Sequence, residues 1–171
     1  MTKIELTPDD KSFLKIAYGI AADLSPDPST QNGAILIRDA SIVAQGANCF
    51  PRGVEVTEER LERPLKYSFI CHAERDVIYA AARRGVKTDG LVMYCPWYAC
   101  TDCARAIIQA GIVEVIGHRT ILDRTPDRWK ETIDIALGML DDAGVKHSFV
   151  GGEEGELGAV GVLFNGEIWY P

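Results

Sequence analysis

Apolar residues recur at helical spacing along the first part of the chain, three or four positions apart. The spacing predicts an amphipathic helix whose inward face carries Phe13, Leu14, Ala17, Tyr18, Ala21 and Leu24. Thr7 suits the N-cap and Pro8 suits the first helical position, so we expect the helix to begin there. The proline-containing run from Ser25 to Pro28 is expected to end it.

Short apolar runs further along the chain predict strands. Segments 34–38 and 41–46, joined by a polar turn, are typical of a β-hairpin. From residue 73 onward, helical periodicity alternates with apolar runs. We expect helices over 73–84, 101–110 and 127–143, and strands over 91–95, 112–116 and 145–150. This alternation predicts an α/β fold in which helices cover the faces of a central sheet.

No repeat or linker divides the chain, so we expect residues 1–171 to form one domain. The polar segment 48–67 is expected to be a functional loop, because unstructured connections of about 20 residues are uncommon in compact domains. Segment 151–158 is acidic and rich in glycine and predicts a second loop. Between segments 160–164 and 167–170, the pair Asn165-Gly166 favours a type I′ turn and predicts an added C-terminal hairpin.

Composition narrows the class of protein. Hydrophobic residues make up 47% and charged residues 25% of the 171 positions, as in a globular protein. The net charge of −7 argues against a nucleic-acid polymer as partner, although a local basic patch stays open. No apolar run approaches the roughly 20 residues that span a membrane. The acidic, proline-containing N-terminus is unlike a secretory signal, so we expect a cytoplasmic protein without a membrane partner.

Five cysteines without a secretory signal argue against a disulfide framework. The spacing Cys100-x-x-Cys103 occurs both in redox pairs and in metal sites. His72 precedes another predicted helix, and together the three side chains offer one imidazole and two thiolates. Zinc held by three protein ligands keeps a fourth position for water, which is the catalytic pattern. The other three cysteines are interpreted as small buried residues, namely Cys49, Cys71 and Cys95.

Glu74 follows His72 by two residues, so its carboxylate can approach the same metal water without being a ligand. A carboxylate in that position can accept the proton of the water and pass it to a leaving group. Glu74 could also be a solvated acid that stabilises a helix N-terminus. The combination of His-x-Glu with Cys-x-x-Cys favours the first interpretation, because it is the signature of zinc-dependent nucleoside deaminases.

Four blocks of the sequence resemble the deoxycytidylate deaminase family, and they follow one another in that family's order. The blocks are Asp27 to Ala34, Ala47 to Gly53, His72 to Arg75, and Cys100 to Ile108. The likeness extends over about residues 8–150. It implies a three-layer α/β/α fold of the cytidine-deaminase type with a mixed sheet, catalytic zinc, hydrolysis of dCMP to dUMP, a homo-oligomer, and in many members a response to dCTP and dTTP.

The resemblance also implies roles for individual residues. Asn48 matches the asparagine that contacts the sugar, and Ala73 matches the residue whose backbone touches the base. Arg52, in a Phe-Pro-Arg-Gly loop, is a candidate contact for a phosphate, with a surface arginine as the alternative. Arg83 matches a helix arginine that the family links to a switch between active and inactive states.

Two positions depart from the family pattern. Ala99 stands before Cys100 where the family usually has proline, and Asn32 stands where it often has valine. Trp97 and Tyr98 precede Ala99 and are either contacts for the base or aromatic residues of the core or an interface. The leading hypothesis is therefore a zinc-dependent deaminase of a small pyrimidine nucleotide, most simply dCMP. The alternatives are a deaminase of another small aminated base or nucleoside, and a non-catalytic zinc-containing regulator that binds nucleotides.

Overall fold

The computed structural model describes residues 8–171, so the predicted N-cap Thr7 lies outside the described residues. Its centre is a five-stranded mixed sheet in the order β2-β1-β3-β4-β5. The strands are β1 (Gly33–Arg38), β2 (Ser41–Ala47), β3 (Val92–Tyr94), β4 (Glu114–His118) and β5 (Lys146–Val150). Strand β1 pairs antiparallel with β2 and β3, whereas β3, β4 and β5 are parallel.

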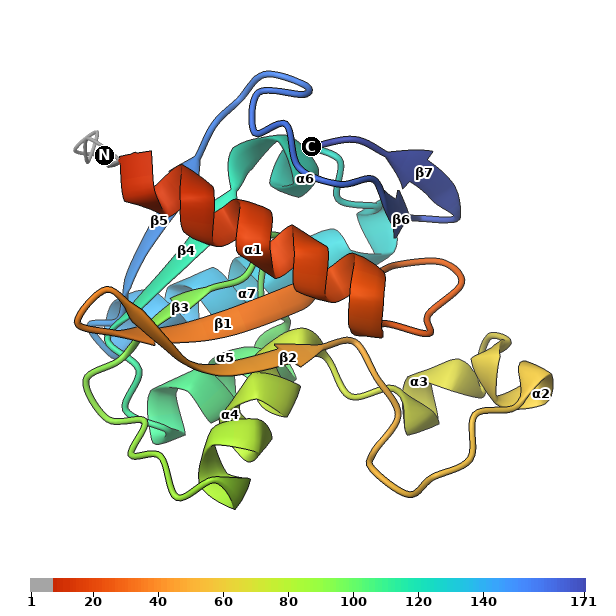
Figure 1. The fold of residues 1–171 in the computed structure, drawn as a ribbon, viewed down its shortest axis with the longest axis horizontal. Helices are drawn as coiled ribbons and strands as arrows, with labels where there is room; N and C mark the ends of the chain where they lie inside the picture. Colours follow the sequence, from red (N-terminus) through yellow and green to blue (C-terminus); the bar gives the residue numbers. More distant parts are fainter. Residues whose placement is uncertain (1–7) are drawn as a thin grey trace.

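Helices cover the sheet on both faces and make three layers, as predicted (Figure 1). Helix α1 (Pro8–Leu24) packs on one face. The opposite face carries α4 (Ala73–Arg83), α5 (Thr101–Gln109) and α7 (Asp127–Asp142). Each interface has its own apolar core: one contains Leu14 and Tyr18 of α1, and the other contains Val77 of α4 and Ile107 of α5.

Shorter elements complete the fold. They are α2 (Glu58–Leu61), α3 (Lys66–Phe69), α6 (Arg119–Asp123), β6 (Val162–Phe164) and β7 (Glu167–Trp169). The predicted loop 48–67 therefore contains α2 and the start of α3. Strands β6 and β7 pair antiparallel, and both turn residues have positive φ, 53° at Asn165 and 90° at Gly166, which confirms the C-terminal hairpin.

Two glycines allow helices to approach the β1–β2 hairpin closely. A Cβ on Gly33 would lie 2.2 Å from the carbonyl oxygen of Ala17 in α1. A Cβ on Gly46 would lie 2.5 Å from the backbone nitrogen of Val77 in α4. Because these contacts are backbone to backbone, neither position has room for a side chain. The two glycines thereby fix the distances of α1 and α4 from the hairpin.

The topology brings two helix N-termini to one edge of the sheet. Helix α4 runs back along the sheet before β3 begins, and α5 follows the carboxyl end of β3. The first residues of both helices therefore lie near the carboxyl end of β3. This edge of the sheet carries the candidate chemistry.

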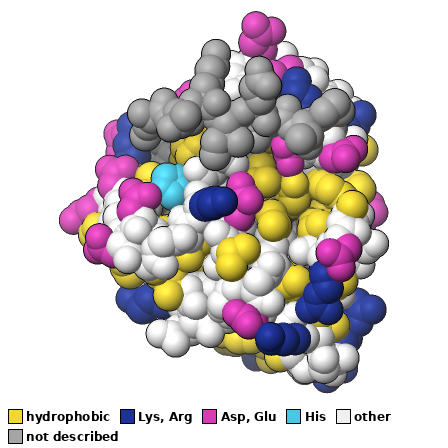
Figure 2. All heavy atoms as spheres, turned by 90° about the vertical axis from the view of Figure 1, so that its left-hand side faces the viewer, with side chains coloured by type: hydrophobic (Ala, Val, Ile, Leu, Met, Phe, Trp, Pro, Cys, Tyr) yellow, Lys and Arg dark blue, Asp and Glu magenta, His cyan; other side chains and the backbone are white. Residues whose placement is uncertain are grey.

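Acidic, basic and apolar side chains are interspersed over the face drawn in Figure 2. Between residues 8 and 171, no helix combines the length and the apolar character needed to cross a membrane.

Candidate metal centre and active site

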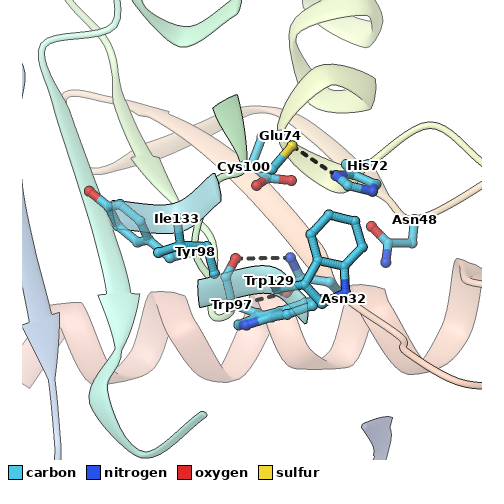
Figure 3. A pocket seen from close by; sticks show the side chains of 9 residues that line it. All are labelled: Asn32, Asn48, His72, Glu74, Trp97, Tyr98, Cys100, Trp129 and Ile133. Carbon is cyan, nitrogen blue, oxygen red and sulfur yellow. Dashed lines mark hydrogen bonds between the residues drawn. The ribbon is translucent and has the colours of Figure 1, made fainter. Parts of the chain in front are cut away.

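The candidate metal ligands lie at the beginnings of two helices. His72 is the N-cap residue of α4 and Cys100 is the N-cap residue of α5, while Cys103 lies in the first turn of α5. Neither N-cap side chain bonds to the backbone of its own helix. Both side chains are thus available to each other, and Figure 3 shows Cys100 and His72 directed toward one another.

The spacing of the three ligand atoms suits tetrahedral zinc. His72 Nδ1 lies 3.5 Å from Cys100 Sγ and 3.6 Å from Cys103 Sγ, and the two sulfurs are 3.7 Å apart. Zinc with bonds of about 2.3 Å to sulfur and about 2.0 Å to nitrogen requires about 3.8 Å between sulfurs and about 3.5 Å between sulfur and nitrogen. Within residues 8–171, this is the group of His, Cys, Asp or Glu side chains that is placed to hold a metal ion.

The contact between the two cysteine side chains shifts their pKa values in opposite directions. The hydrogen bond with Cys103 and the contact with His72 lower the pKa of Cys100 to about 3 despite burial. The same shared hydrogen bond, together with burial, raises the pKa of Cys103 well above its ordinary value. Two cysteine side chains and an imidazole thus lie in contact, and binding of a metal ion would release the protons that the ligand atoms carry.

Glu74 lies beside this group with its side chain only 2% exposed. Burial raises the pKa of its carboxyl above the usual range, and the neighbouring His72 opposes the shift. Glu74, His72 and Cys100 line the same pocket (Figure 3). The structure therefore places a buried carboxyl in the same pocket as two of the three candidate metal ligands.

The cysteines outside the motif remain thiols. Burial, reinforced by Asp76, raises the pKa of Cys49 to about 12, and burial raises that of Cys71 to about 11. Their backbones pair in an isolated β-bridge. Cys95 is fully buried and accepts a hydrogen bond of 3.2 Å from the Asn32 amide. Cys95 is thus the small buried residue that the sequence predicts, whereas the prediction is wrong for Cys49 and Cys71, which are only partly buried.

Asn48 and Ala73, the predicted contacts for sugar and base, are joined to each other. The Ala73 N–H donates to Asn48 Oδ1 at 3.0 Å, and the Asn48 amide donates to the carbonyl of Thr30 at 2.9 Å. Asn48 lines the pocket, so its position suits the predicted role. In this structure, however, its hydrogen-bonding groups hold the loop before β1 against the start of α4.

Asn32, the departure from the family pattern, fixes the loop between β3 and α5. Its amide donates to the Trp97 carbonyl at 3.1 Å, and its side-chain oxygen accepts from the Trp97 backbone at 3.2 Å. A valine could make neither bond. The Trp97 ring is consequently held as one wall of the pocket (Figure 3).

Tyr98 borders the pocket, but its side chain extends away from His72 and Asn48 (Figure 3). Its ring packs 5.0 Å from that of Phe149 in β5 and 6.1 Å from that of His147. Arg52 and Arg83 are both exposed, and neither is among the residues that line this pocket. Arg83 ends α4, about 15 Å along the helix from Ala73 at the rise of an α-helix.

Helix α7 supplies pocket residues that the sequence analysis did not identify. Trp129 packs edge-on against His72 with ring centroids 5.7 Å apart, and Ile133 lies one turn further along the helix. The spacing of Trp129 and Ile133 is the signal that both share one buried face. That signal does not distinguish a pocket wall from ordinary core, because both are apolar.

The family model and the similar proteins all indicate the same family of deaminases. The model of the cytidine and deoxycytidylate deaminase zinc-binding region matches residues 7–118. An uncharacterized deaminase encoded in the luxG 3′ region of Aliivibrio fischeri is 35% identical over 136 residues, which cover 80% of this chain and 89% of the relative. Deoxycytidylate deaminase from mouse is 37% identical over 113 residues. That alignment covers 61% of each chain, so this chain matches less than two thirds of the mouse enzyme.

Solved structures share the fold. The apo dCMP deaminase of cyanophage S-TIM5 superimposes with a TM-score of 0.63 at 23% identity, over 85% of this chain and all of the other. Acinetobacter baumannii RibD gives a TM-score of 0.57 at 17% identity, over 82% of this chain and 35% of that one. At these identities the likeness concerns the fold alone, and it confirms the predicted three-layer arrangement around a mixed sheet.

Proposed function

The chain belongs to the zinc-dependent cytidine and deoxycytidylate deaminases, and from that premise we propose that it converts dCMP to dUMP with release of ammonia. The observation that carries this proposal is the placement of His72, Cys100 and Cys103 at the spacing of tetrahedral zinc ligands, with the buried Glu74 beside them. A closed structural site would need a fourth protein ligand.

His72, Cys100 and Cys103 would hold the zinc and leave its fourth position for a reactant. When bound, zinc acts as a Lewis acid that lowers the pKa of water to about 7. The walls formed by Trp97 and Trp129 would limit the access of other water molecules to this position. A base bound there would compete with Asn48 for the N–H of Ala73.

Glu74 is placed to move the protons. Its carboxylate accepts one proton from the attacking water and passes it to the ring nitrogen, and it then accepts the second proton of that water and passes it to the departing amino group. One water is consumed, a carbon–oxygen bond forms, the carbon–nitrogen bond of the amino group breaks, and ammonia leaves. Burial raises the pKa of Glu74, which makes its carboxylate a stronger base toward water than an exposed carboxylate.

The proposal is tested by ammonia release from zinc-loaded protein. The compounds tested are dCMP, CMP, deoxycytidine and dCTP, together with adenosine and guanine as purine comparisons. We expect turnover of dCMP to exceed that of the others. If protein that holds one zinc per chain releases no ammonia from any cytosine compound, the proposal is refuted.

Glu74→Gln separates an enzyme from a zinc-containing regulator. We expect turnover to fall roughly 10²-fold to 10⁴-fold, because the amide cannot accept the proton. Zinc content and the unfolding temperature should stay close to those of the wild type. Glu131→Gln on the exposed side of α7 is the matched control and should retain full activity. Unchanged turnover in Glu74→Gln would remove the assigned role of Glu74.

The homo-oligomer implied by the family remains a prediction. The C-terminal hairpin exposes Ile168 and, after it, Tyr170, at 66% and 67% of their surfaces. Light scattering of the purified protein at working concentration measures the mass directly, and a monomeric mass would remove the prediction.

A further inference from the structure

A second cavity adjoins the catalytic pocket. The two share four lining residues, Asn48, His72, Trp97 and Trp129. The second cavity is also lined by three cationic side chains, those of Arg63, Lys66 and Arg128. A ligand could therefore extend from the pocket beside Glu74, past Trp129, into a compartment with basic walls.

The charge of Lys66 is already balanced. Its ammonium group lies 2.7 Å and 2.9 Å from the two carboxylate oxygens of Asp27, and both side chains are buried. It also contacts Ser29 Oγ. This pair anchors the segment before α4 to the loop after α1. Lys66 accordingly adds little net attraction for an anion.

Unlike Lys66, Arg63 and Arg128 form no ion pair with a carboxylate among the described residues. The Arg63 guanidinium bonds to Ser29 Oγ at 3.3 Å, and that of Arg128 bonds to Asn165 Oδ1 at 2.9 Å. Both acceptors are neutral, and no ion pair involves either arginine within the described part of the chain. In a protein with a net charge of −7, two such cations at one cavity mark a local site for an anion.

Both arginines line a cavity that His72 also lines. Arg128 is the second residue of α7 and precedes Trp129, whose ring packs 5.7 Å from that of His72. Arg128 also borders a third, more open cavity together with His72 and Cys100. Planar guanidinium groups bind phosphate through paired hydrogen bonds. An aromatic wall between a base pocket and two arginines suits a nucleoside that carries a phosphate.

We propose that Arg63 and Arg128 bind the phosphate of the substrate in this second cavity, so that the substrate class is a nucleoside monophosphate. This inference rests on the proposed function for the position of the base. It assigns the phosphate to two arginines other than Arg52, which is exposed and lines neither of the two adjoining pockets. It also gives the C-terminal hairpin a role, because Asn165 holds Arg128 at the cavity.

The hairpin is well anchored for that role. The Gly166 N–H donates to the Ser29 carbonyl at 2.8 Å, and the Gln31 N–H donates to the Leu163 carbonyl at 2.8 Å. Phe164 packs edge-on against Trp97 with ring centroids 5.2 Å apart. The hairpin thus supports a pocket wall as well as Arg128. Asn165 is a positioning residue, since it contacts the arginine and not the cavity.

The test is calorimetric titration of the zinc-loaded protein with matched pairs of ligands, dUMP against deoxyuridine and GMP against guanosine. We expect dUMP to bind at least tenfold more tightly than deoxyuridine. Arg63→Ala and Arg128→Ala should each weaken dUMP binding by roughly 10-fold to 100-fold, as for loss of a charge-assisted hydrogen bond. Binding of deoxyuridine should not change in either variant.

Two further variants separate charge from fold. Arg84→Ala removes an exposed arginine at the C-terminal end of α4 and should leave both affinities unchanged. Asn165→Asp retains an acceptor for Arg128 and tolerates the positive φ of the turn, but its carboxylate pairs with the guanidinium and balances the positive charge. We expect this variant to lose affinity for dUMP and to retain affinity for deoxyuridine.

The outcomes are distinct for the two proposals. Equal affinity of the wild type for each monophosphate and its nucleoside, or no binding at all, would overturn the phosphate site. The phosphate site would also be overturned if Arg63→Ala and Arg128→Ala still bound each monophosphate more tightly than its nucleoside by the wild-type ratio. If no cytosine compound releases ammonia while GMP or dUMP binds through these arginines, the phosphate site stands and the proposed reaction falls.

Discussion

Arg75 is a charged neighbour of the metal ligands that is not itself a ligand. Its guanidinium is half-buried and interacts with the sulfur of Cys103. Burial alone would lower the pKa of Arg75, but the interactions with the neighbouring cysteines, Cys103 foremost, outweigh it and raise the pKa. Groups of this kind stabilise thiolates and orient them for the metal.

We expect Arg75→Met to weaken zinc affinity by roughly 10-fold to 100-fold, because methionine keeps much of the apolar stem and removes the positive charge beside Cys103. Competition with a coloured chelator measures this affinity. Arg84→Met, at an exposed position of the same helix, is the control. Equal zinc affinities in Arg75→Met and the wild type would show that Arg75 does not act through the thiolate.

The candidate site was predictable where its residues form compact motifs. His72 and Glu74 are two positions apart, and Cys100 and Cys103 three apart, so each half of the group is visible in the sequence. Arg128 and Trp129 were not predicted as site residues. Their proximity to His72 depends on how α7 packs against α5, which local periodicity does not specify.

At the scale of elements, the prediction succeeded where the repeat of apolar residues extends over several turns of a helix or along a hairpin. The hairpin of β1 and β2, the helices α4, α5 and α7, and the C-terminal hairpin all lie within a few residues of their predicted bounds. Helices α2, α3 and α6 have four or five residues, which is too short to show helical periodicity. Tertiary contacts such as the Lys66–Asp27 pair hold α3 in place instead.

The close approach of α4 to β2 predicts a strong effect at Gly46. We expect Gly46→Ala to lower the free energy of unfolding by at least about 1–3 kcal/mol, because its Cβ would lie 2.5 Å from a backbone nitrogen. Urea unfolding followed by circular dichroism measures the change. In α7, Gly138→Ala meets nothing within 4 Å and should stabilise by about 0.4–1 kcal/mol. A loss of similar size in both variants would contradict this account.

At the scale of the whole molecule, His118 connects layers on the side of the sheet covered by α1. Its Nδ1 lies 2.8 Å from the hydroxyl of Tyr18 in α1, and its Nε2 lies 3.4 Å from Glu156 in the loop before β6. Trp169 of β7 stacks on its ring at 5.6 Å. Burial lowers the pKa of His118 below its ordinary value, although Glu156 opposes the shift.

This shift gives stability a defined dependence on pH. Between the folded pKa of His118 and its ordinary value of 6.5, the unfolded chain binds more protons than the folded one. Stability from His118 is therefore complete above about pH 6.5 and is lost as the pH falls through this window. Urea unfolding should show a larger loss between pH 7.5 and 5.5 in the wild type than in His118→Gln.

Nuclear magnetic resonance provides the direct check, because the chain has only three histidines. The ring signals of His118, assigned by their absence in His118→Gln, should titrate with a midpoint below 6.5. A midpoint at or above that value would show that Glu156 outweighs burial.

The placement of the tryptophans has an optical consequence. Two of the three indoles, Trp97 and Trp129, line the pocket with their rings 5.8 Å apart and nearly perpendicular at 86°. Indoles this close couple their excited states, so the near-ultraviolet circular dichroism should contain a signal from the pair. Trp169 lies apart from them, against His118. The protein thus carries a pair of coupled indoles that reports on the pocket without an added label.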